Sequence, residues 1–185
     1  MIRIAAEADI APMLAIYEPY VQNTTCSFEY ESPTPEEFLR RFRDYTRQFP
    51  WLVWEEAGEI LGYAYGSAPF GDRAAYAWCA EASVYVRQDQ RGRGIGRRLY
   101  AALEALLTRQ GYQSLYALIT TENQASQAFH RAVGYVPRAE FPRYGFKFGR
   151  WLGIHWYEKR LSFVEFPSAA PVSWKEIVID AQNFI

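Results

Sequence analysis

The sequence predicts a mixed α/β (α+β) fold in a single domain. Its 185 residues, half of them hydrophobic, are enough to enclose one substantial core. Segments of strand length rich in apolar and aromatic residues alternate with segments whose apolar residues recur at helical spacing. No internal repeat, linker or low-complexity tract divides the chain. These observations favour a sheet flanked by helices.

The first part of the chain predicts one strand, two helices and a β-hairpin. Thr34 is followed three residues later by Glu37, which is the capping box that opens many helices. The turn Ala57-Gly58 separates two apolar, aromatic-rich segments, as in a hairpin. The predicted elements are a strand at 2–5, a helix capped by Asp9, a loop with aromatic content at 23–35, a helix from Thr34 to about Arg47, and strands at 49–56 and 59–67.

The second part predicts strands and helices in alternation. Gly111 and Gly134 each follow a helical pattern and are expected to end it. The predicted strands are 75–86, 114–120, 135–138 and 151–161, and the predicted helices are 95–109 and 123–133. Residues 1–161 are therefore expected to form the domain. Residues 162–185, interrupted by Pro167 and Pro171, are expected to be a C-terminal extension that packs on its body.

Charge and composition exclude several classes of protein. Lys and Arg number 20 and Asp and Glu number 21, so the net charge is −1, which argues against broad binding to nucleic acid or anionic membranes. Cys26 and Cys79 are the only cysteines and are expected to be small buried hydrophobic residues. With two histidines in addition, no metal-ligand spacing is present, and no metal is expected.

The N-terminal residues argue against secretion. Arg3, Glu7 and Asp9 interrupt the place where a signal peptide would need an apolar stretch. The chain also contains no run of about 18 apolar residues that could span a membrane. We expect a cytoplasmic protein.

A glycine-rich loop between a predicted strand and a predicted helix is the most specific signal in the chain. Glycines at 92, 94 and 96 allow positive φ and a close approach of a ligand to the backbone. The N-terminus of the next helix offers free N–H groups, and four nearby arginines (91, 93, 97 and 98) add positive charge. The loop is therefore predicted to bind a diphosphate.

Other interpretations of this loop fit less well. A dinucleotide-binding fingerprint would need glycine where Arg97 stands, and a Walker loop would need Gly-Lys-Ser/Thr, which is missing. A flexible turn beside a solvated basic helix end is the plain alternative. The next helix adds support, because Asn123, Ser126 and His130 form a polar stripe suited to an extended cofactor. That stripe could also simply face water.

The pattern Arg91-x-x-Gly94-x-Gly96 resembles the pyrophosphate signature of GCN5-related N-acetyltransferases (GNATs). Residues 75–86, 130–135 and 145–151 resemble phosphinothricin and methionine sulfoximine N-acetyltransferases, and with shorter matches earlier the similarity covers nearly all of residues 1–161. The resemblance implies the GNAT fold, a mixed sheet splayed between its two central strands. It also implies acetyl-CoA as the cosubstrate and a homodimer.

Glu81 and His130 are the predicted catalytic residues. Glu81 lies in an otherwise apolar strand, where burial would raise its pKa and make it a base for the substrate amine. The alternative is a structural carboxylate paired with an arginine. His130 stands where the wider superfamily often has a tyrosine, and it could act as acid or base. The predicted cofactor-binding residues are Val84, Tyr85, Val86, Arg91, Gly92, Arg93, Gly94, Ile95, Gly96, Arg97, Asn123 and Ser126.

An amino-acid substrate carries a carboxylate that needs a cationic partner. Arg73 is the favoured candidate, with Arg143 and Lys147 as others. Phe28 and Tyr76, with Tyr30, could line the side-chain pocket, although each aromatic could equally be ordinary packing. The predicted substrate-binding residues are thus Phe28, Arg73, Tyr76, Glu81 and Lys147.

The sequence therefore predicts an N-acetyltransferase that acts on the amino group of a small amino-acid-like molecule by direct attack in a ternary complex. Acetylation of a peptide N-terminus or a polyamine is an alternative within the class. A CoA-binding regulatory module without catalysis is another alternative, which the presence of both Glu81 and His130 disfavours. A nicotinamide-dependent oxidoreductase is disfavoured by Arg97.

Overall fold

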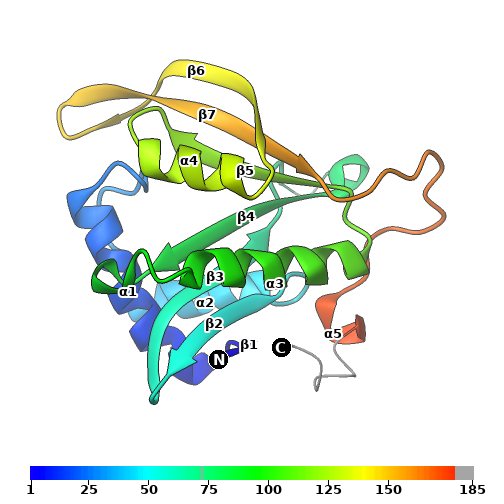
Figure 1. Cartoon of the computed structure of the whole chain (residues 1–185), viewed down its shortest axis with the longest axis horizontal. Helices are drawn as coiled ribbons and strands as arrows, with labels where there is room; N and C mark the ends of the chain where they lie inside the picture. Colours follow the sequence, from blue (N-terminus) through cyan, green and yellow to red (C-terminus); the bar gives the residue numbers. More distant parts are fainter. Residues whose placement is uncertain (72, 178–185) are drawn as a thin grey trace.

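A computed structural model describes residues 1–71 and 73–177 of the chain. In this part of the chain, seven strands form one sheet in the order β1-β2-β3-β4-β5-β7-β6, with helices on both faces (Figure 1). The elements are β1 (Ile2–Ile4), α1 (Ile10–Asn23), α2 (Pro35–Tyr45), β2 (Trp51–Glu56), β3 (Glu59–Ser67), β4 (Cys79–Val86), α3 (Ile95–Gln110), β5 (Ser114–Thr120), α4 (Gln124–Ala132), β6 (Val136–Lys147), β7 (Arg150–Arg160) and α5 (Trp174–Ile177).

The sheet splays between its two central strands, as the resemblance implied. Neighbouring strands pair antiparallel except β4 and β5, which are parallel and share only three residue pairs, the last being Glu81 with Tyr116. Beyond this pair the rest of β4 continues alongside β3, while β5 continues alongside β7. Figure 1 shows β4 and β5 separating along their length. The hydrogen-bonding edges of both strands are thereby released from each other.

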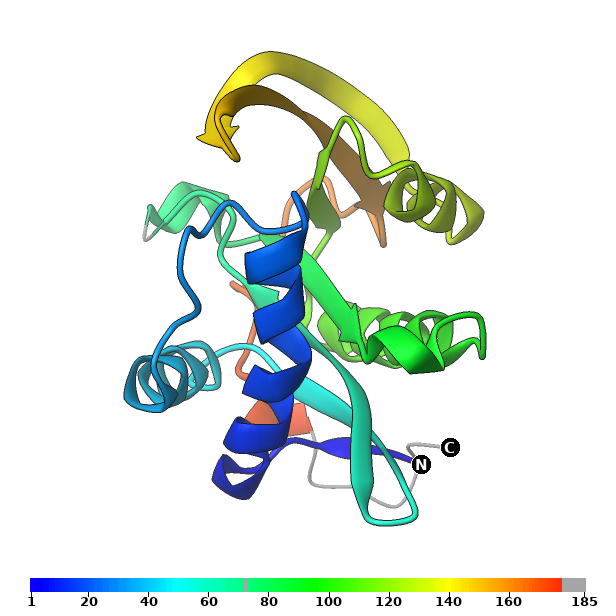
Figure 2. The same cartoon turned by 90° about the vertical axis from the view of Figure 1, so that its left-hand side faces the viewer.

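Two hydrophobic clusters hold the helices on opposite faces of the sheet (Figure 2). On one face, Leu99 and Leu103 of α3 are fully buried against the central strands. On the other face, Met13 and Val21 of α1 pack with Trp51 and its aromatic neighbours. At about 25 cal/mol per Å² of buried apolar surface, this two-sided burial is the main stabilising contribution to the fold.

The predicted helix ends are largely confirmed. The Thr34 hydroxyl accepts a hydrogen bond from the Glu37 N–H at 3.2 Å, and the Asn123 side chain accepts one from the Ser126 N–H at 3.0 Å. Gly111 ends α3 with φ of 101°, the left-handed conformation that glycine adopts without strain. Asp9 precedes α1, but its carboxylate binds Arg3 and the Ala6 N–H, so it does not cap that helix.

Two strand predictions need correction. Strand β4 begins at Cys79, because residues 74–76 form a short 3-10 helix. Strand β6 extends from Val136 to Lys147, much further than the predicted 135–138. It includes two prolines, which usually argue against a strand, but it is an edge strand whose register shifts after Pro137 and again after Phe141. An edge position with bulges tolerates residues that cannot donate a ladder hydrogen bond.

The first part of the C-terminal extension packs on the body of the domain. The Gln110 side-chain amide donates to the carbonyls of Gln48 and Val172 at 2.8 and 2.7 Å. The Trp174 indole N–H donates to the Thr46 carbonyl at 2.9 Å. The extension therefore joins the end of α3 to the segment between α2 and β2. Residues 178–185 lie outside the described residues, and no helix among the described ones is both long and apolar enough to cross a membrane.

The substitution Gln110→Ala tests this attachment. It removes two hydrogen bonds that join α3 to the extension, so we expect the free energy of unfolding to fall by about 1–3 kcal/mol. Urea denaturation measures the change. Gln113→Ala is the matched control, because its side chain accepts only one exposed hydrogen bond, from Val164, and should change stability by at most about 0.5 kcal/mol. Equal stabilities for the two variants would contradict this role of Gln110.

Candidate active site

A cavity of about 580 Å³ opens where β4 and β5 separate, between the N-terminal ends of α3 and α4. It joins residues from the two strands, both helices and the end of α1. Thirteen of the predicted site residues line it, namely Glu81, Val84, Tyr85, Val86, Arg91, Gly92, Gly94, Ile95, Gly96, Arg97, Asn123, Ser126 and His130. The structure therefore brings the glycine loop and the candidate base to one continuous space.

The free edge of β4 directs main-chain groups into this space. Along β4, successive residues direct their N–H and C=O groups alternately toward β3 and away from it. The Arg87 N–H bonds to the Leu61 carbonyl of β3, so the β4 residues an even number of positions before Arg87 face β3. The remaining ones, including Val84 and Val86, direct theirs away from β3, into the gap left by β5. The Val86 carbonyl accepts a hydrogen bond from the Tyr20 hydroxyl at 2.5 Å. The Val86 N–H lies 3.4 Å from the same hydroxyl, so Val84 in particular keeps main-chain groups that can pair with an extended ligand as a strand would.

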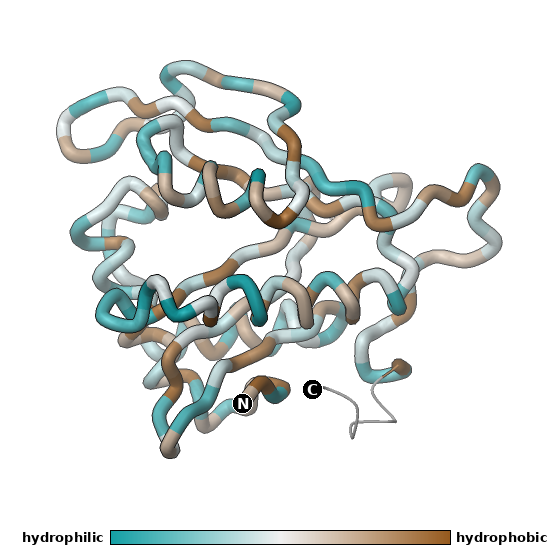
Figure 3. The backbone as a smooth tube through the Cα atoms, viewed as in Figure 1, coloured by the Kyte–Doolittle hydropathy of each residue, from teal (hydrophilic) through white to brown (hydrophobic). Residues whose placement is uncertain are grey.

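The glycine loop has the geometry of an anion site. Gly92 and Gly94 have φ of 80° and 78°, and a Cβ at either position would meet no atom within 4 Å. The first hydrogen bond of α3 runs from the Arg98 N–H to the Gly94 carbonyl, which leaves the N–H groups of residues 95–97 without helical partners. Figure 3 shows this loop and the start of α3 as a hydrophilic segment. Backbone donors and the helix dipole here favour a phosphate.

The arginines of the loop do not all face the cavity. Arg91 and Arg97 line it, and the Arg91 guanidinium lies 5.0 Å from the centre of the Tyr20 ring. Arg93 is a correction to the predicted set, because its guanidinium binds both carboxylate oxygens of Glu56 at 2.8 and 3.0 Å and is not part of the cavity wall. Arg98 is likewise directed away, over the ring of Trp54.

Glu81 presents a largely buried carboxyl group to the cavity. Burial raises its pKa to about 7, and desolvation is the cause. Among the ion pairs of residues 1–71 and 73–177, none includes Glu81, so the alternative of a structural carboxylate paired with an arginine has no support. A carboxyl group with this pKa can accept a proton near neutral pH.

His130 is buried at the cavity wall with both ring nitrogens in contact with polar groups. Nε2 lies 3.0 Å from the Tyr100 hydroxyl, and Nδ1 lies 2.8 Å from the Ser126 carbonyl. Burial lowers its pKa to about 4, so the imidazole is neutral at pH 7. The Tyr100 hydroxyl also donates to the Ala82 carbonyl at 2.7 Å. His130 is therefore suited to hydrogen bonding there and not to carrying a positive charge.

The predicted substrate residues are dispersed. Phe28 packs against Gly145, where an added Cβ would lie 3.1 Å from its ring. Arg73 and Tyr76 are exposed in the segment before β4, close in sequence to Glu81. Lys147 is a correction, because its ammonium group is buried and its donors are directed to three main-chain carbonyls. No donor remains for a substrate carboxylate.

Sequence reasoning missed two tyrosines that shape the cavity. Tyr20 bonds the free edge of β4, and Tyr100 connects His130 to Ala82. Each is nearly inaccessible to solvent. The available signal was a tyrosine within the apolar stripe of a helix, because a buried tyrosine hydroxyl usually has a polar partner. The pattern alone could not say which partner.

Comparison with known proteins identifies the family. The family model described as an acetyltransferase (GNAT) domain matches residues 2–156. The chain belongs to the GNAT family of acetyltransferases. It is 40% identical to an L-methionine sulfoximine/L-methionine sulfone acetyltransferase of Pseudomonas aeruginosa, over 86% of this chain and 94% of the relative. It is 34% identical to a phosphinothricin N-acetyltransferase of Streptomyces viridochromogenes, over 85% of this chain and 86% of that relative.

Solved structures agree with this GNAT assignment. A phosphinothricin acetyltransferase from Sinorhizobium meliloti in complex with acetyl-CoA superposes with a TM-score of 0.84 at 33% identity, covering 93% of this chain and 92% of the other. A putative acetyltransferase from Salmonella typhimurium, solved with its cofactor acetyl-CoA, has a TM-score of 0.87 at 30% identity. The match covers 92% of this chain and 98% of the other. This GNAT is therefore an N-acetyltransferase. No group of three or more possible metal ligands occurs in the described part of the chain.

Proposed function

We propose that this enzyme transfers the acetyl group of acetyl-CoA to the amino group of a small amino-acid-like substrate of the phosphinothricin or methionine sulfoximine type. One observation carries the proposal: a single cavity joins an anion cradle at the start of α3 to the buried, unpaired carboxyl group of Glu81. The relatives named for phosphinothricin and methionine sulfoximine support this substrate class.

The proposed mechanism assigns one task to each part of the cavity wall. The cosubstrate supplies an acetyl group activated as a thioester. The N–H groups of residues 95–97 and the loop glycines would hold its diphosphate, and the free main-chain groups of β4 at Val84 would align its extended arm. A main-chain N–H of that edge is in a position to polarise the acetyl carbonyl. In this proposal the reacting carbon would lie close to Glu81.

Glu81 is assigned the role of base. An α-ammonium group with a pKa near 8 is mostly protonated at pH 7 and cannot attack a carbonyl. Glu81 accepts this proton directly or through a water, and the free amine attacks the thioester carbon without a covalent enzyme intermediate. The C–N bond forms, the C–S bond breaks, and the thiolate of CoA leaves and takes up the second proton that the nitrogen loses. Neutral His130 and the Tyr100 hydroxyl form the polar wall beside it, and the catalytic role of His130 stays a prediction. Cys26 also lines the cavity, and no covalent role is assigned to it.

Thiol release across a panel of amino acids and their amides tests the substrate class. We expect release with methionine sulfoximine or phosphinothricin well above that with polyamines. No release with any amino acid or analogue would contradict the proposal.

Arg73→Ala should raise KM for the carboxylate substrates more than for the matching amides, by about 10-fold or more, because a charge-assisted hydrogen bond would be lost. Arg40→Ala, at an exposed arginine on α2, is the control. Equal effects on acids and amides would exclude Arg73.

We also propose that the protein forms a homodimer. The β6–β7 hairpin carries an unusual concentration of exposed aromatic side chains, and such a patch on a small protein commonly marks an interface. The exposed residues are Phe141, Tyr144, Phe146, Phe148 and Trp151. Sedimentation equilibrium would show twice the mass of one chain, and a monomer would contradict the proposal.

Location in the cytoplasm stays a prediction from the sequence.

A further inference from the structure

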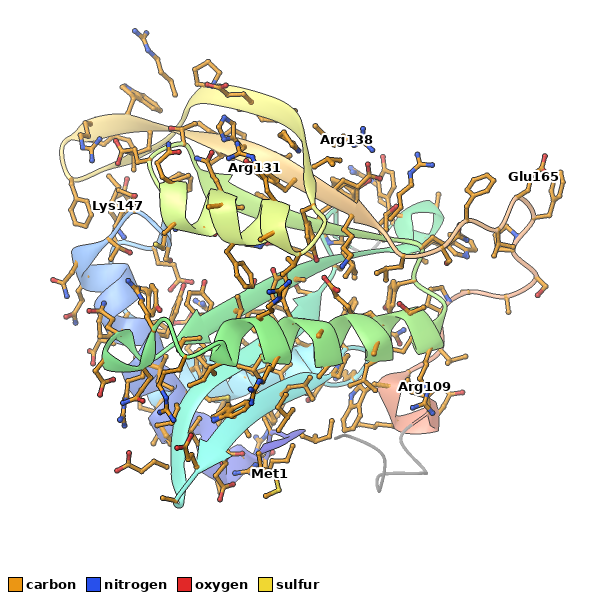
Figure 4. All side chains as sticks on the ribbon, in the orientation of Figure 1. Met1, Arg109, Arg131, Arg138, Lys147 and Glu165 are labelled. Carbon is orange, nitrogen blue, oxygen red and sulfur yellow. The ribbon has the colours of Figure 1, made fainter. Side chains whose placement is uncertain are left out.

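Lys147 is a buried lysine that the proposed reaction does not use. It is the last residue of β6, and only 2% of its surface is exposed. Its ammonium group donates to the carbonyls of Val21, Thr24 and Ser27 at 2.6, 3.0 and 2.7 Å. Figure 4 labels Lys147 beside the C-terminal end of α1, near the tip of the β6–β7 hairpin. One side chain thus holds three points of a single stretch of backbone.

The three carbonyls belong to the end of α1 and the segment that follows it. Val21 lies in the last turn of the helix, and Thr24 is its C-cap. The last carbonyls of a helix have no helical partners and carry partial negative charge, so a cation there satisfies both their hydrogen bonding and the helix dipole. Burial lowers the pKa of Lys147, while the nearby Cys26 and Glu29 oppose this shift. The three hydrogen bonds favour the charged form.

The segment that Lys147 holds is a wall of the active-site cavity. Thr24 and Cys26 line the cavity directly. The Cys26 thiol accepts a hydrogen bond from the Asn123 side-chain amide at 3.1 Å, which brings this segment to the start of α4. On the other side, the Ser27 hydroxyl lies 2.8 Å from the Tyr17 hydroxyl. Residues 24–27 therefore connect α1, α4 and β6, and Lys147 supplies the link to β6.

We propose that Lys147 is a positioning residue that holds residues 24–27 as the wall against which the amine substrate is aligned beside Glu81. This inference rests on the proposed function of the cavity. The diphosphate cradle at residues 92–97 belongs to a separate element, and no contact of Lys147 reaches it. Loosening the wall should therefore weaken use of the amine substrate far more than binding of acetyl-CoA.

The test compares Lys147→Met with Lys147→Arg. Methionine keeps an unbranched side chain of similar length but removes all three donors, so KM for the amine substrate should rise about 10-fold and kcat should fall, because misplacement by about 1 Å is costly. The dissociation constant of acetyl-CoA should stay within about twofold of the wild-type value. Arginine keeps the charge and several donors, so Lys147→Arg should recover part of the loss and also covers the case in which Lys147→Met does not fold.

Gln110→Ala is the matched control for a general loss of stability, because Gln110 binds the C-terminal extension and not residues 24–27. It should leave KM for the amine substrate unchanged. Unchanged KM in Lys147→Met, or a parallel loss of acetyl-CoA affinity, would overturn the proposal. If Lys147→Met does not fold, a folded Lys147→Arg variant that loses acetyl-CoA affinity as much as it loses use of the amine substrate would also overturn it, because the effect would then not be confined to the wall at residues 24–27.

A second readout does not need activity. Chymotrypsin cleavage after Phe28 and Tyr30, followed by mass spectrometry, reports how firmly the segment is held. Cleavage should be faster in Lys147→Met than in Gln110→Ala, and equal rates would contradict the anchoring role. If the wild-type enzyme acetylated no amino-acid-like substrate, the proposed function would fail, whereas the cleavage rates would still decide whether Lys147 anchors this segment.

Discussion

Replacing Glu81 by glutamine is expected to lower kcat by about 10²–10⁴-fold at pH 8, because a positioned general base contributes a factor of this size. Glutamine has nearly the same shape but cannot accept the ammonium proton of the substrate. The dissociation constant of acetyl-CoA should stay near the wild-type value, since the diphosphate cradle is a separate part of the cavity. Steady-state kinetics together with calorimetric titration of acetyl-CoA measure both quantities.

The pH profile provides an independent check of the same residue. The pKa of Glu81 is raised to about 7, so its basic form grows as pH rises through 7. Wild-type kcat should therefore increase over this range and level off above it, and the Glu81→Gln variant should lack this step. Glu158→Gln is the control, because Glu158 is also a buried carboxylate but is paired with Arg138. Unchanged turnover in Glu81→Gln would remove Glu81 from the mechanism.

The same raised pKa has a consequence for stability. The pKa of Glu81 is 4.5 in the unfolded chain and about 7 in the folded protein. Between these two pH values, the folded protein therefore binds the proton of Glu81 more tightly than the unfolded chain does. This contribution is present at low pH and is lost as pH rises through 7. Above pH 7, the charged and buried carboxylate costs roughly 3 kcal/mol of folding free energy. The Glu81→Gln variant should thus be more stable than the wild type at pH 8, although it is less active.

Replacing Gly94 by valine is expected to abolish measurable binding of acetyl-CoA. Gly94 has φ of 78° at the start of α3, and an added side chain would project into open space where the cavity lies. A β-branched residue there would occupy the place of the diphosphate and disfavour the left-handed backbone. Calorimetric titration with acetyl-CoA measures the loss, which we expect to exceed about 100-fold because several charge-assisted hydrogen bonds are lost together.

Gly58→Val separates the two causes. Gly58 has φ of 81° in the turn between β2 and β3, and an added Cβ there also meets no atom within 4 Å. The backbone strain is therefore matched, but Gly58 does not line the active-site cavity. We expect similar losses of melting temperature in both variants and normal acetyl-CoA affinity in Gly58→Val alone. A normal dissociation constant in Gly94→Val would contradict the assignment of the cradle.

The sequence predicted those features that depend on local chemistry. The loop of alternating glycines indicated a diphosphate site because positive φ and free N–H groups are properties of a few consecutive residues, and Gly92 and Gly94 have that conformation. Glu81 was predicted to be a base because an unpaired carboxylate in an apolar strand is costly. The structure shows that its carboxyl group is largely buried and that it takes part in none of the ion pairs of the described residues, while its role stays a proposal. The splay of the sheet came from the resemblance alone.

Features that depend on contacts distant in sequence were not predictable in this way. Lys147 suggested a carboxylate ligand, but its three acceptors lie 120 to 126 positions earlier in the chain. The length of β6 was underestimated, because a strand that contains two prolines is tolerated at a sheet edge and only the sheet order shows that this strand is at one. Tyr100 and His130 are 30 positions apart, and their pairing depends on how α3 and α4 pack.

A crystal structure with acetyl-CoA shows most directly where the diphosphate and the thioester lie. We expect the diphosphate at about 3 Å from the main-chain nitrogens of residues 92–97, with the thioester between β4 and β5 on the side of Glu81. A diphosphate bound elsewhere, or a thioester that ends away from Glu81, would contradict it.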